Sequence, residues 1–210
     1  GGEYTVAIGY ITDNSLVSKN FRANTLPGMI AELKIDINSS TPQDLNIVPT
    51  DNTPPQINIL SPIAQDYQRP FVLPVLVMVT DTESGVYSQS LSFDGRLINS
   101  GDLLDLFYLP LGTHTVIATA ADFMGNTATV STQFRLVATV SSTISDIDYA
   151  YLLGWVSDGG IRNSLVKKLQ KIKKEEFNNF LNELNAQRGK YINEQAFLLI
   201  QRDINWLLNN

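Results

Sequence analysis

The stretch VYSQSLSFDG, residues 86–95, carries the signal that decides the fold of this 210-residue chain. Polar and apolar side chains alternate from Val86 to Phe93, which is the period-two pattern of a β-strand with one buried face. Asp94-Gly95 then supplies the two-residue turn that closes many β-hairpins. The stretch therefore predicts antiparallel β-structure on both sides of it.

Residues 55–139 continue this pattern, with a turn signal about every ten residues. In the run 113–122, Val116, Ala118 and Ala120 share one face. About seven short strands with such turns are typical of a Greek-key β-sandwich. Besides 86–93, the expected strands are 57–60, 71–80, 103–109, 113–122 and 128–137.

Residues 1–38 contain three further strand-like runs, at 4–10, 17–23 and 29–37. Three strands are too few to bury a stable core by themselves. We therefore expect the end of an upstream β-domain, or alternatively a hairpin packed on the next domain. Residues 39–54 are rich in Pro, Ser, Thr and Asn, which indicates a semi-extended linker.

The last part of the chain, residues 144–210, changes to a period of 3.6. Apolar stripes predict helices over 144–155, 161–172 and 177–184, and Asn193 is a plausible N-cap for a fourth helix. All nine Pro residues precede this part, and its net charge is +1 against −7 for residues 1–140. The fold class is therefore multidomain: an all-β sandwich, preceded by a partial β-domain or hairpin, and followed by a small helical bundle.

Composition excludes several classes of protein. Hydrophobic residues make up 43% and charged residues 17%, which argues against a disordered chain. No apolar run reaches the length of a membrane span, and the acidic balance argues against a nucleic-acid partner. With no Cys, disulfides and zinc–thiolate sites are excluded. The chain begins with Gly1, without Met or a signal peptide, so we expect a piece of a longer exported protein.

Four motifs in residues 53–126 resemble a bacterial Ig-like domain. They are TPPQINI (53–59), DTESGV (81–86), LGTHTV (111–116) and ADFMGN (121–126). The resemblance implies a β-sandwich from an exported or cell-surface bacterial protein. The Cys pair and buried Trp of antibody domains are missing, so only the bacterial branch is implied.

The helical part resembles the FIMAH module that follows such Ig-like domains at the C-terminus of exported bacterial proteins. The similarity lies at GIRNSLVKKL (160–169) and FLNELNAQRGKYI (180–192). Tyr191 stands where the module often has His, and the connection at 171–176 is shorter than expected. That connection leaves open whether 161–184 is two helices or one bent helix.

Candidate sites are few, and no catalytic, cofactor-binding or metal-ligating residue is predicted. His114 is expected to be structural, because there is no Gly-x-Ser-x-Gly nucleophile motif to accompany it. No cofactor is expected. The alternative is a calcium ion, because hard cations bind where several oxygen ligands converge. The oxygen-rich candidates, which are also ordinary turn residues, are Asp51, Asn52, Asp81, Glu83, Asp122 and Asn126.

Two surface features are interpreted as structural, and for each the alternative is that it binds a ligand. The Lys cluster could attract wall polymers, but it falls on the solvated side of an amphipathic helix; its members are Lys167, Lys168, Lys171 and Lys174. Aromatic residues could form a sugar-binding surface, but their strand parity favours the core. They are Tyr4, Tyr10, Phe21, Phe71, Phe107, Tyr108 and Phe123, the last forming with Met124 the most exposed-looking pair.

The sequence therefore favours a protein that is not an enzyme. We expect a non-catalytic accessory region, a spacer with a docking or capping module, of a secreted or cell-surface bacterial protein that could be a hydrolase. The alternative is a module that targets carbohydrate or cell wall. The expected partners are upstream domains of the same polypeptide, with cell wall or polysaccharide as a further partner in the alternative, and no nucleic acid or membrane span.

Overall fold

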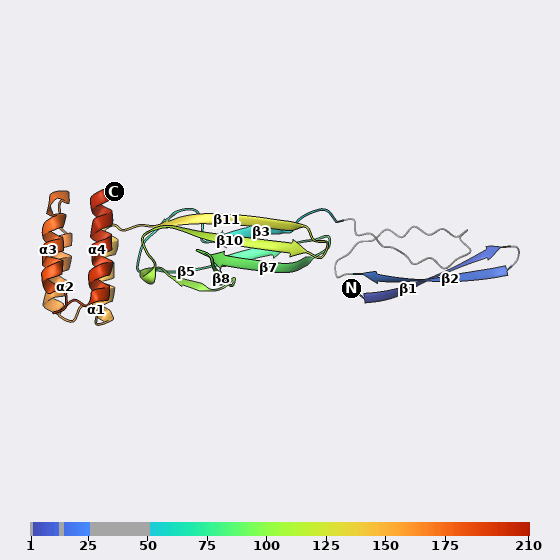
Figure 1. The fold of residues 1–210 in the computed structure, drawn as a ribbon, viewed down its shortest axis with the longest axis horizontal. Coiled ribbons are helices and arrows are strands. Elements are labelled where there is room, and N and C mark those ends of the chain that lie inside the picture. Colours follow the sequence, from blue (N-terminus) through green and yellow to red (C-terminus); the bar gives the residue numbers. More distant parts are fainter. Residues whose placement is uncertain (1, 13–14, 26–50) are drawn as a thin grey trace. The chain divides into compact units, whose positions relative to one another are not determined.

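The computed structural model describes residues 2–12, 15–25 and 51–210, which form strands first and helices last (Figure 1). The strands are β1 (Gly2–Thr12), β2 (Ser15–Thr25), β3 (Gln56–Ser61), β4 (Asp66–Tyr67), β5 (Val72–Pro74), β6 (Leu76–Thr80), β7 (Val86–Phe93), β8 (Arg96–Ile98), β9 (Leu103–Asp105), β10 (Gly112–Asp122) and β11 (Thr127–Leu136). The helices are α1 (Val140–Leu152), α2 (Gly159–Leu169), α3 (Phe177–Gln187) and α4 (Glu194–Asn209), with short 3₁₀ turns η1 (Leu106–Tyr108) and η2 (Lys174–Glu176).

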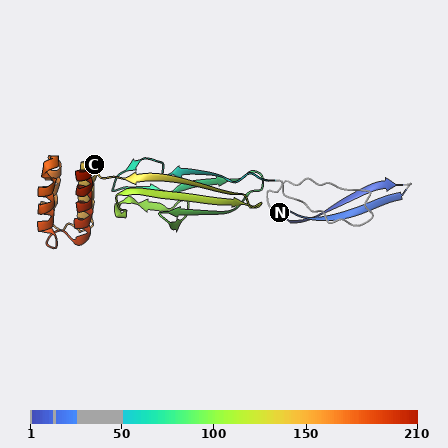
Figure 2. The ribbon, with the colours of Figure 1, turned by 45° about the horizontal axis from the view of Figure 1, so that its top comes forward.

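The strands of the described residues form four sheets, compatible with a β-sandwich followed by a helical part. The largest sheet has the order β4-β11-β10-β7-β8, and β7, β10 and β11 lie side by side in both ribbon views (Figures 1 and 2). The other sheets pair β1 with β2, β3 with β6 and β5 with β9. β4 joins β11 in parallel, with Asp66 opposite Arg135, whereas β5 and β9 are antiparallel.

Strand β10 confirms the alternation expected from the sequence. His114, Val116, Ala118, Ala120 and Asp122 are all buried on one face of this strand. Apolar side chains fill most of that face, so burial of their surface stabilises the sheet. The two polar members, at opposite ends of the row, therefore need partners of their own.

The expected strand over 71–80 is wrong as a single element. It is divided at Val75 into β5 and β6, which pair with different strands. Pro74 has no N–H to continue a ladder, and the Val75 N–H instead donates to the Asp102 carbonyl at 2.9 Å. The chain therefore changes sheets at this point.

The expected strand over 103–109 is also shortened. β9 ends at Asp105, and residues 106–108 form the 3₁₀ turn η1. The Asp105 carboxylate accepts a hydrogen bond from the Phe107 N–H at 3.0 Å, which favours a turn over an extended strand. Leu106 and Phe107 are thereby buried.

The four helices confirm the helical part and correct its boundaries. Thr139 caps α1 by a reciprocal capping box with Ser142. The helix ends at Leu152, before the expected Trp155, because Gly154 turns the chain with a φ of 72°. Asp158 caps the start of α2 by accepting a hydrogen bond from the Ile161 N–H.

Residues 161–184 form two helices, α2 and α3, separated by η2, which settles the question left open by the short connection. Asn193 caps α4, as expected, by accepting a hydrogen bond from the Ala196 N–H. Side chains from all four helices form one apolar core, with Ile147, Leu165, Leu184, Ile200 and Ile204 fully buried. None of the helices in the described part of the chain combines the length and apolar character that a bilayer span requires.

The chain divides into two compact units. Among the described residues, one comprises 2–12, 15–25, 51–59, 77–91 and 117–130, and the other comprises 60–76, 92–116 and 131–210. The second unit, called unit 2 below, contains all four helices together with segments of the β-region. The domain boundaries expected at 38, 54, 139 and 144 remain predictions.

The N-terminal expectations are described only in part. β1 and β2 confirm the strands expected at 4–10 and 17–23, and they pair antiparallel with Val6 opposite Phe21. The third expected strand, 29–37, and linker residues 39–50 lie outside the described residues.

Candidate functional site

Three aspartates from separate segments meet in one acidic cluster, which we call the Asp cluster: Asp51, Asp81 and Asp122. Asp51 precedes β3, Asp81 directly follows β6, and Asp122 is the last residue of β10. One carboxylate oxygen from each lies within 4.8 Å of the others. The fold thus brings together three of the oxygen-rich candidates of the sequence.

Asp81 and Asp122 each organise the turn that follows them. Asp81 Oδ1 accepts hydrogen bonds from the N–H groups of Glu83, Ser84 and Gly85 at 3.1, 2.9 and 2.7 Å. Asp122 Oδ1 likewise accepts from two backbone N–H groups, both at 2.8 Å. These turns fix both carboxylates in place.

Asp51 ties the segment before β3 to both turns. Its Oδ2 accepts a hydrogen bond from the Ser84 N–H at 3.1 Å, and its backbone carbonyl accepts one from Asn126 Nδ2 at 3.1 Å. Asn126 Nδ2 also donates to Asp122 Oδ2 at 2.7 Å. Asn126 therefore lies beside the cluster as a positioning residue.

Electrostatics reflect the crowding of negative charge. The pKa of Glu83 is raised, first by a hydrogen bond with Asp51, then by desolvation and by repulsion from Asp51 and Asp81. The pKa of Asp51 is lowered, chiefly because the Ser84 hydroxyl lies against its carboxylate. Ser84 was not selected as a candidate from the sequence. Its position directly after Glu83 in DTESGV could have indicated that it lies near the acidic residues.

Chemically, the Asp cluster suits a hard cation. Carboxylate oxygens are the ligands that calcium and magnesium prefer, and calcium accepts irregular sets of six to eight oxygens. No imidazole or thiol lies within the group, which makes a soft-metal site a poor fit.

His114 has the structural environment that the sequence favours. It is 2% exposed and packs against Phe93 and Phe134 at centroid distances of 5.5 and 5.3 Å. Its Nδ1 lies 2.6 Å from Asp94 Oδ2, and its Nε2 lies 2.9 Å from the Pro110 carbonyl oxygen. The ring therefore links two turns through both of its nitrogens.

A buried ionic group in unit 2, which we call the Arg69 cluster, was missed by sequence reasoning. Arg69 donates a hydrogen bond to Asp203 of α4, and its Nε lies 3.6 Å from Asp146 Oδ2 of α1. Desolvation raises the pKa of Asp203 to about 8 despite the favourable charge of Arg69, and repulsion from Asp146 adds to the rise. Desolvation also raises the pKa of Asp146.

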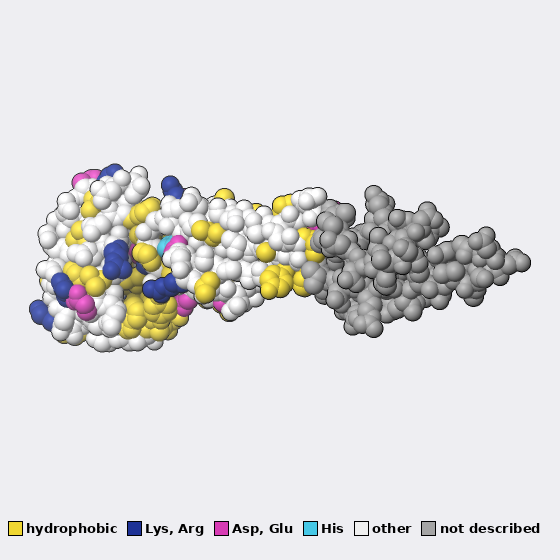
Figure 3. Space-filling view, turned by 45° about the vertical axis from the view of Figure 1, so that its right-hand side comes forward, with side chains coloured by type: hydrophobic (Ala, Val, Ile, Leu, Met, Phe, Trp, Pro, Cys, Tyr) yellow, Lys and Arg dark blue, Asp and Glu magenta, His cyan; other side chains and the backbone are white. Residues whose placement is uncertain are grey.

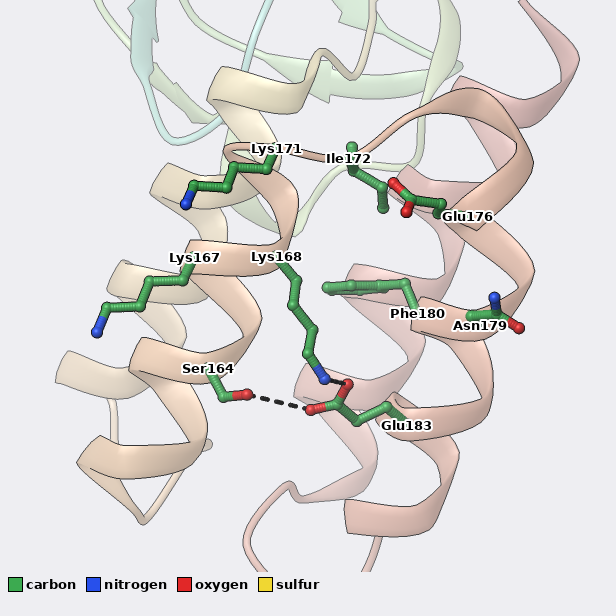
Figure 4. Close-up of a pocket in the computed structure, with 9 residues that line it drawn as sticks. All are labelled: Ser164, Lys167, Lys168, Lys171, Ile172, Glu176, Asn179, Phe180 and Glu183. Atoms are coloured by element: carbon green, nitrogen blue, oxygen red, sulfur yellow. Dashed lines mark hydrogen bonds and ion pairs between the residues drawn. The ribbon is translucent and has the colours of Figure 1, made fainter.

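The Lys cluster lies beside a groove of about 530 Å³ between α2 and α3 (Figure 4). Lys167, Lys168 and Lys171 line it and are exposed, as expected for a solvated face. Lys168 forms an ion pair with Glu183, which in turn accepts a hydrogen bond from the Ser164 hydroxyl at 3.2 Å. The acidic partner reduces the positive potential that a polyanion would meet.

The aromatic candidates separate into different environments. Phe107 is buried, whereas Phe71 and Tyr108 are exposed. Phe123, with Met124 beside it, is half-buried and packs edge-to-face on Tyr87 at 5.3 Å. The described surface exposes hydrophobic side chains near basic ones, as the face in Figure 3 illustrates. The side chains of Tyr4, Tyr10 and Phe21 lie outside the described residues.

Among known proteins, several solved structures are similar to part of this chain. No protein-family model and no curated protein matches the chain. An endo-β-1,4-mannanase from Thermotoga petrophila is 16% identical over 42% of this chain, with a TM-score of 0.35. The match spans only about a fifth (21%) of the mannanase chain.

Two further solved structures are similar at the same level. The fibronectin(III)-like modules of Clostridium thermocellum CbhA are 13% identical over 39% of this chain and 96% of theirs, with a TM-score of 0.31. The SrpA adhesin from Streptococcus sanguinis is 17% identical over 49% of this chain and 75% of its own, with a TM-score of 0.29.

Proposed function

We propose that the chain is a non-catalytic accessory region of a secreted or cell-surface bacterial protein. In this proposal residues 55–139 form an Ig-like spacer, and residues 144–210 form a FIMAH-type docking or capping module. The partners are upstream domains of the same polypeptide. The observation that supports this proposal most strongly is the buried Arg69 cluster, which forms a rigid joint between the helices and the β-region of unit 2.

The Arg69 cluster supports this role because it connects helices to the β-region of unit 2. Arg69 lies between β4 and β5, Asp146 lies on α1 and Asp203 lies on α4. All three side chains are buried. A buried charge that loses its partner is strongly destabilising, so the three groups favour one fixed arrangement. A spacer needs this kind of rigid connection.

A non-catalytic role is also supported by how the histidine is used. Both nitrogens of His114 have acceptors, and the buried ring packs against the Phe93 and Phe134 rings. A general base needs a nitrogen within reach of its substrate. The protein's one imidazole is therefore engaged in the fold.

The rigid joint can be tested by a distance measurement. Because the chain has no Cys, Leu97→Cys and Leu152→Cys give two unique sites for spin labels, in β8 and α1 of unit 2. Both positions are highly exposed, at 81% and 78%, so the labels disturb little. We expect a single narrow distance distribution between them. A broad or two-peaked distribution would contradict a spacer built on a rigid joint.

The alternative function is a targeting module for carbohydrate or cell wall. The observation that favours it is Tyr108, which is exposed and packs edge-to-face near Trp155 at 6.1 Å. Aromatic rings at a surface offer flat apolar faces with a polar edge, which suits a sugar ring.

A pull-down with insoluble polysaccharides and purified cell wall separates the two functions. The accessory proposal predicts that the full chain stays in the supernatant. Binding that is lost in Tyr108→Ala and retained in Tyr87→Ala, another exposed tyrosine, would favour the targeting module instead.

A further inference from the structure

The Asp cluster joins three chain segments that are distant in sequence. Asp51 and Asp81 are half-buried, and Asp122 is buried at 1% exposure. Oxygens of three like-charged groups within 4.8 Å repel one another, and the repulsion is stronger where solvent is excluded. Such an arrangement gains stability from a counter-charge at its centre.

Ser84 gives a second and independent observation. Its hydroxyl is buried, with the residue only 1% exposed, and it forms no hydrogen bond of normal geometry within the described part of the chain. A buried hydroxyl without such a partner costs free energy. The Ser84 N–H donates to Asp51 Oδ2 at 3.1 Å and to Asp81 Oδ1 at 2.9 Å, so this residue lies directly at the Asp cluster.

We propose that Asp51, Asp81 and Asp122 bind a calcium ion, with the Ser84 hydroxyl beside it. The backbone N–H groups of the DTESGV turn bond to Asp81 Oδ1, so Asp81 Oδ2 is the oxygen directed to the ion. Further carbonyl or water oxygens complete the six to eight that calcium accepts. Magnesium fits less well, because it demands near-ideal octahedral geometry.

The ion would fasten the segment before β3 to the turns after β6 and β10. At present these contacts depend on a few hydrogen bonds, such as those from Ser84 and Asn126 to Asp51. Calcium binding therefore stabilises the folded chain by mass action. This site is separate from the accessory role, and its failure would leave that role unchanged.

The test is a calcium titration of the full chain by isothermal calorimetry, with thermal unfolding in calcium and in chelator. We expect saturable binding with a Kd of about 10⁻³ M or tighter, as in extracellular calcium modules, and a higher Tm in calcium than in chelator. Magnesium at the same concentration should shift the Tm less. No heat and no Tm difference for the wild-type chain would overturn the proposal without any variant being needed.

Asp81→Asn locates the site, because the amide oxygen can still accept the turn hydrogen bonds while the charge is lost. We expect binding at least about tenfold weaker and the calcium-dependent Tm shift to disappear. Asp102→Asn is the matched control, since Asp102 also accepts a backbone hydrogen bond, from the Asn99 N–H at 2.8 Å, but lies outside the cluster. An equal loss in Asp102→Asn, or an unchanged shift in Asp81→Asn, would contradict the assignment.

Discussion

Arg69 donates a hydrogen bond to Asp203 although the two residues lie 134 positions apart in the chain. One belongs to the segment between β4 and β5, and the other belongs to the last helix. Both are buried, and Asp146 joins them from α1. This relationship makes the helices and part of the β-region one unit, and the first two predictions concern it.

Arg69→Met should destabilise the folded chain by about 3–5 kcal/mol, because it leaves two buried acids without their cation. Arg135→Met is the matched control, since Arg135 also pairs with an aspartate, Asp66, but at an exposed site. The control should cost about 1 kcal/mol or less. Urea unfolding curves measure both free energies, and equal losses would count against a buried joint.

The pKa of Asp203, raised from 3.8 to about 8, predicts a pH dependence of stability. The folded chain keeps a proton that the unfolded chain releases above its ordinary pKa. Protonation of Asp203 therefore adds to the free energy of unfolding. This contribution is fully present below the unfolded pKa and is lost as the pH rises through about 8, with a slope of at most about 1.4 kcal/mol per pH unit.

Asp203→Asn removes this titration and keeps the size of the side chain. As the pH rises from about 5 to about 8, the unfolding free energy of the wild type should therefore fall relative to that of Asp203→Asn. Urea unfolding at several pH values measures it. A difference that is the same at every pH would show that Asp203 does not hold the proton.

His114→Ala should destabilise the chain by about 2–4 kcal/mol, because it opens a cavity beside the Phe93 and Phe134 rings and removes two polar contacts. His114→Phe keeps the volume and the stacking, so its smaller loss should report the polar contacts alone. Chemical unfolding of both variants gives the comparison. A His114→Ala variant as stable as wild type would contradict a structural role for this residue.

The features predicted correctly from the sequence are those with local causes. Alternation predicted β7 and β10, and Asn193 was recognised as a cap because its hydrogen bond reaches only three residues ahead. Pro74 was a local signal for the division at Val75, but the partner at Asp102 is not revealed by any local pattern.

The candidate sites follow the same rule. Asp51, Asp81 and Asp122 were each recognised as oxygen-rich turn residues, but only the fold brings them within reach of one another. Asp122 shares the buried parity of His114 and Val116 on β10, so its burial could have been inferred from the strand pattern. The Arg69 cluster offered no such signal, because its members come from a connecting segment and two separate helices.

The sequence alone suggests that Trp fluorescence should follow the helical part by itself, since Trp155 and Trp206 both lie there. The fold changes this expectation. Trp155 packs against Phe107 of η1 at a centroid distance of 5.5 Å, and Arg69 connects to α1 and α4. Unit 2 should therefore unfold in one cooperative step.

The most direct measurement compares two probes of unit 2 during guanidinium unfolding. Trp fluorescence reports the helical part through Trp206 of α4 and its contact with η1 through Trp155, and a dye on Leu97→Cys, the chain's single cysteine, reports strand β8. A rigid accessory region predicts that the two transitions coincide in midpoint and slope. A helical transition that is complete while the β8 probe still reports folded strands would contradict the account.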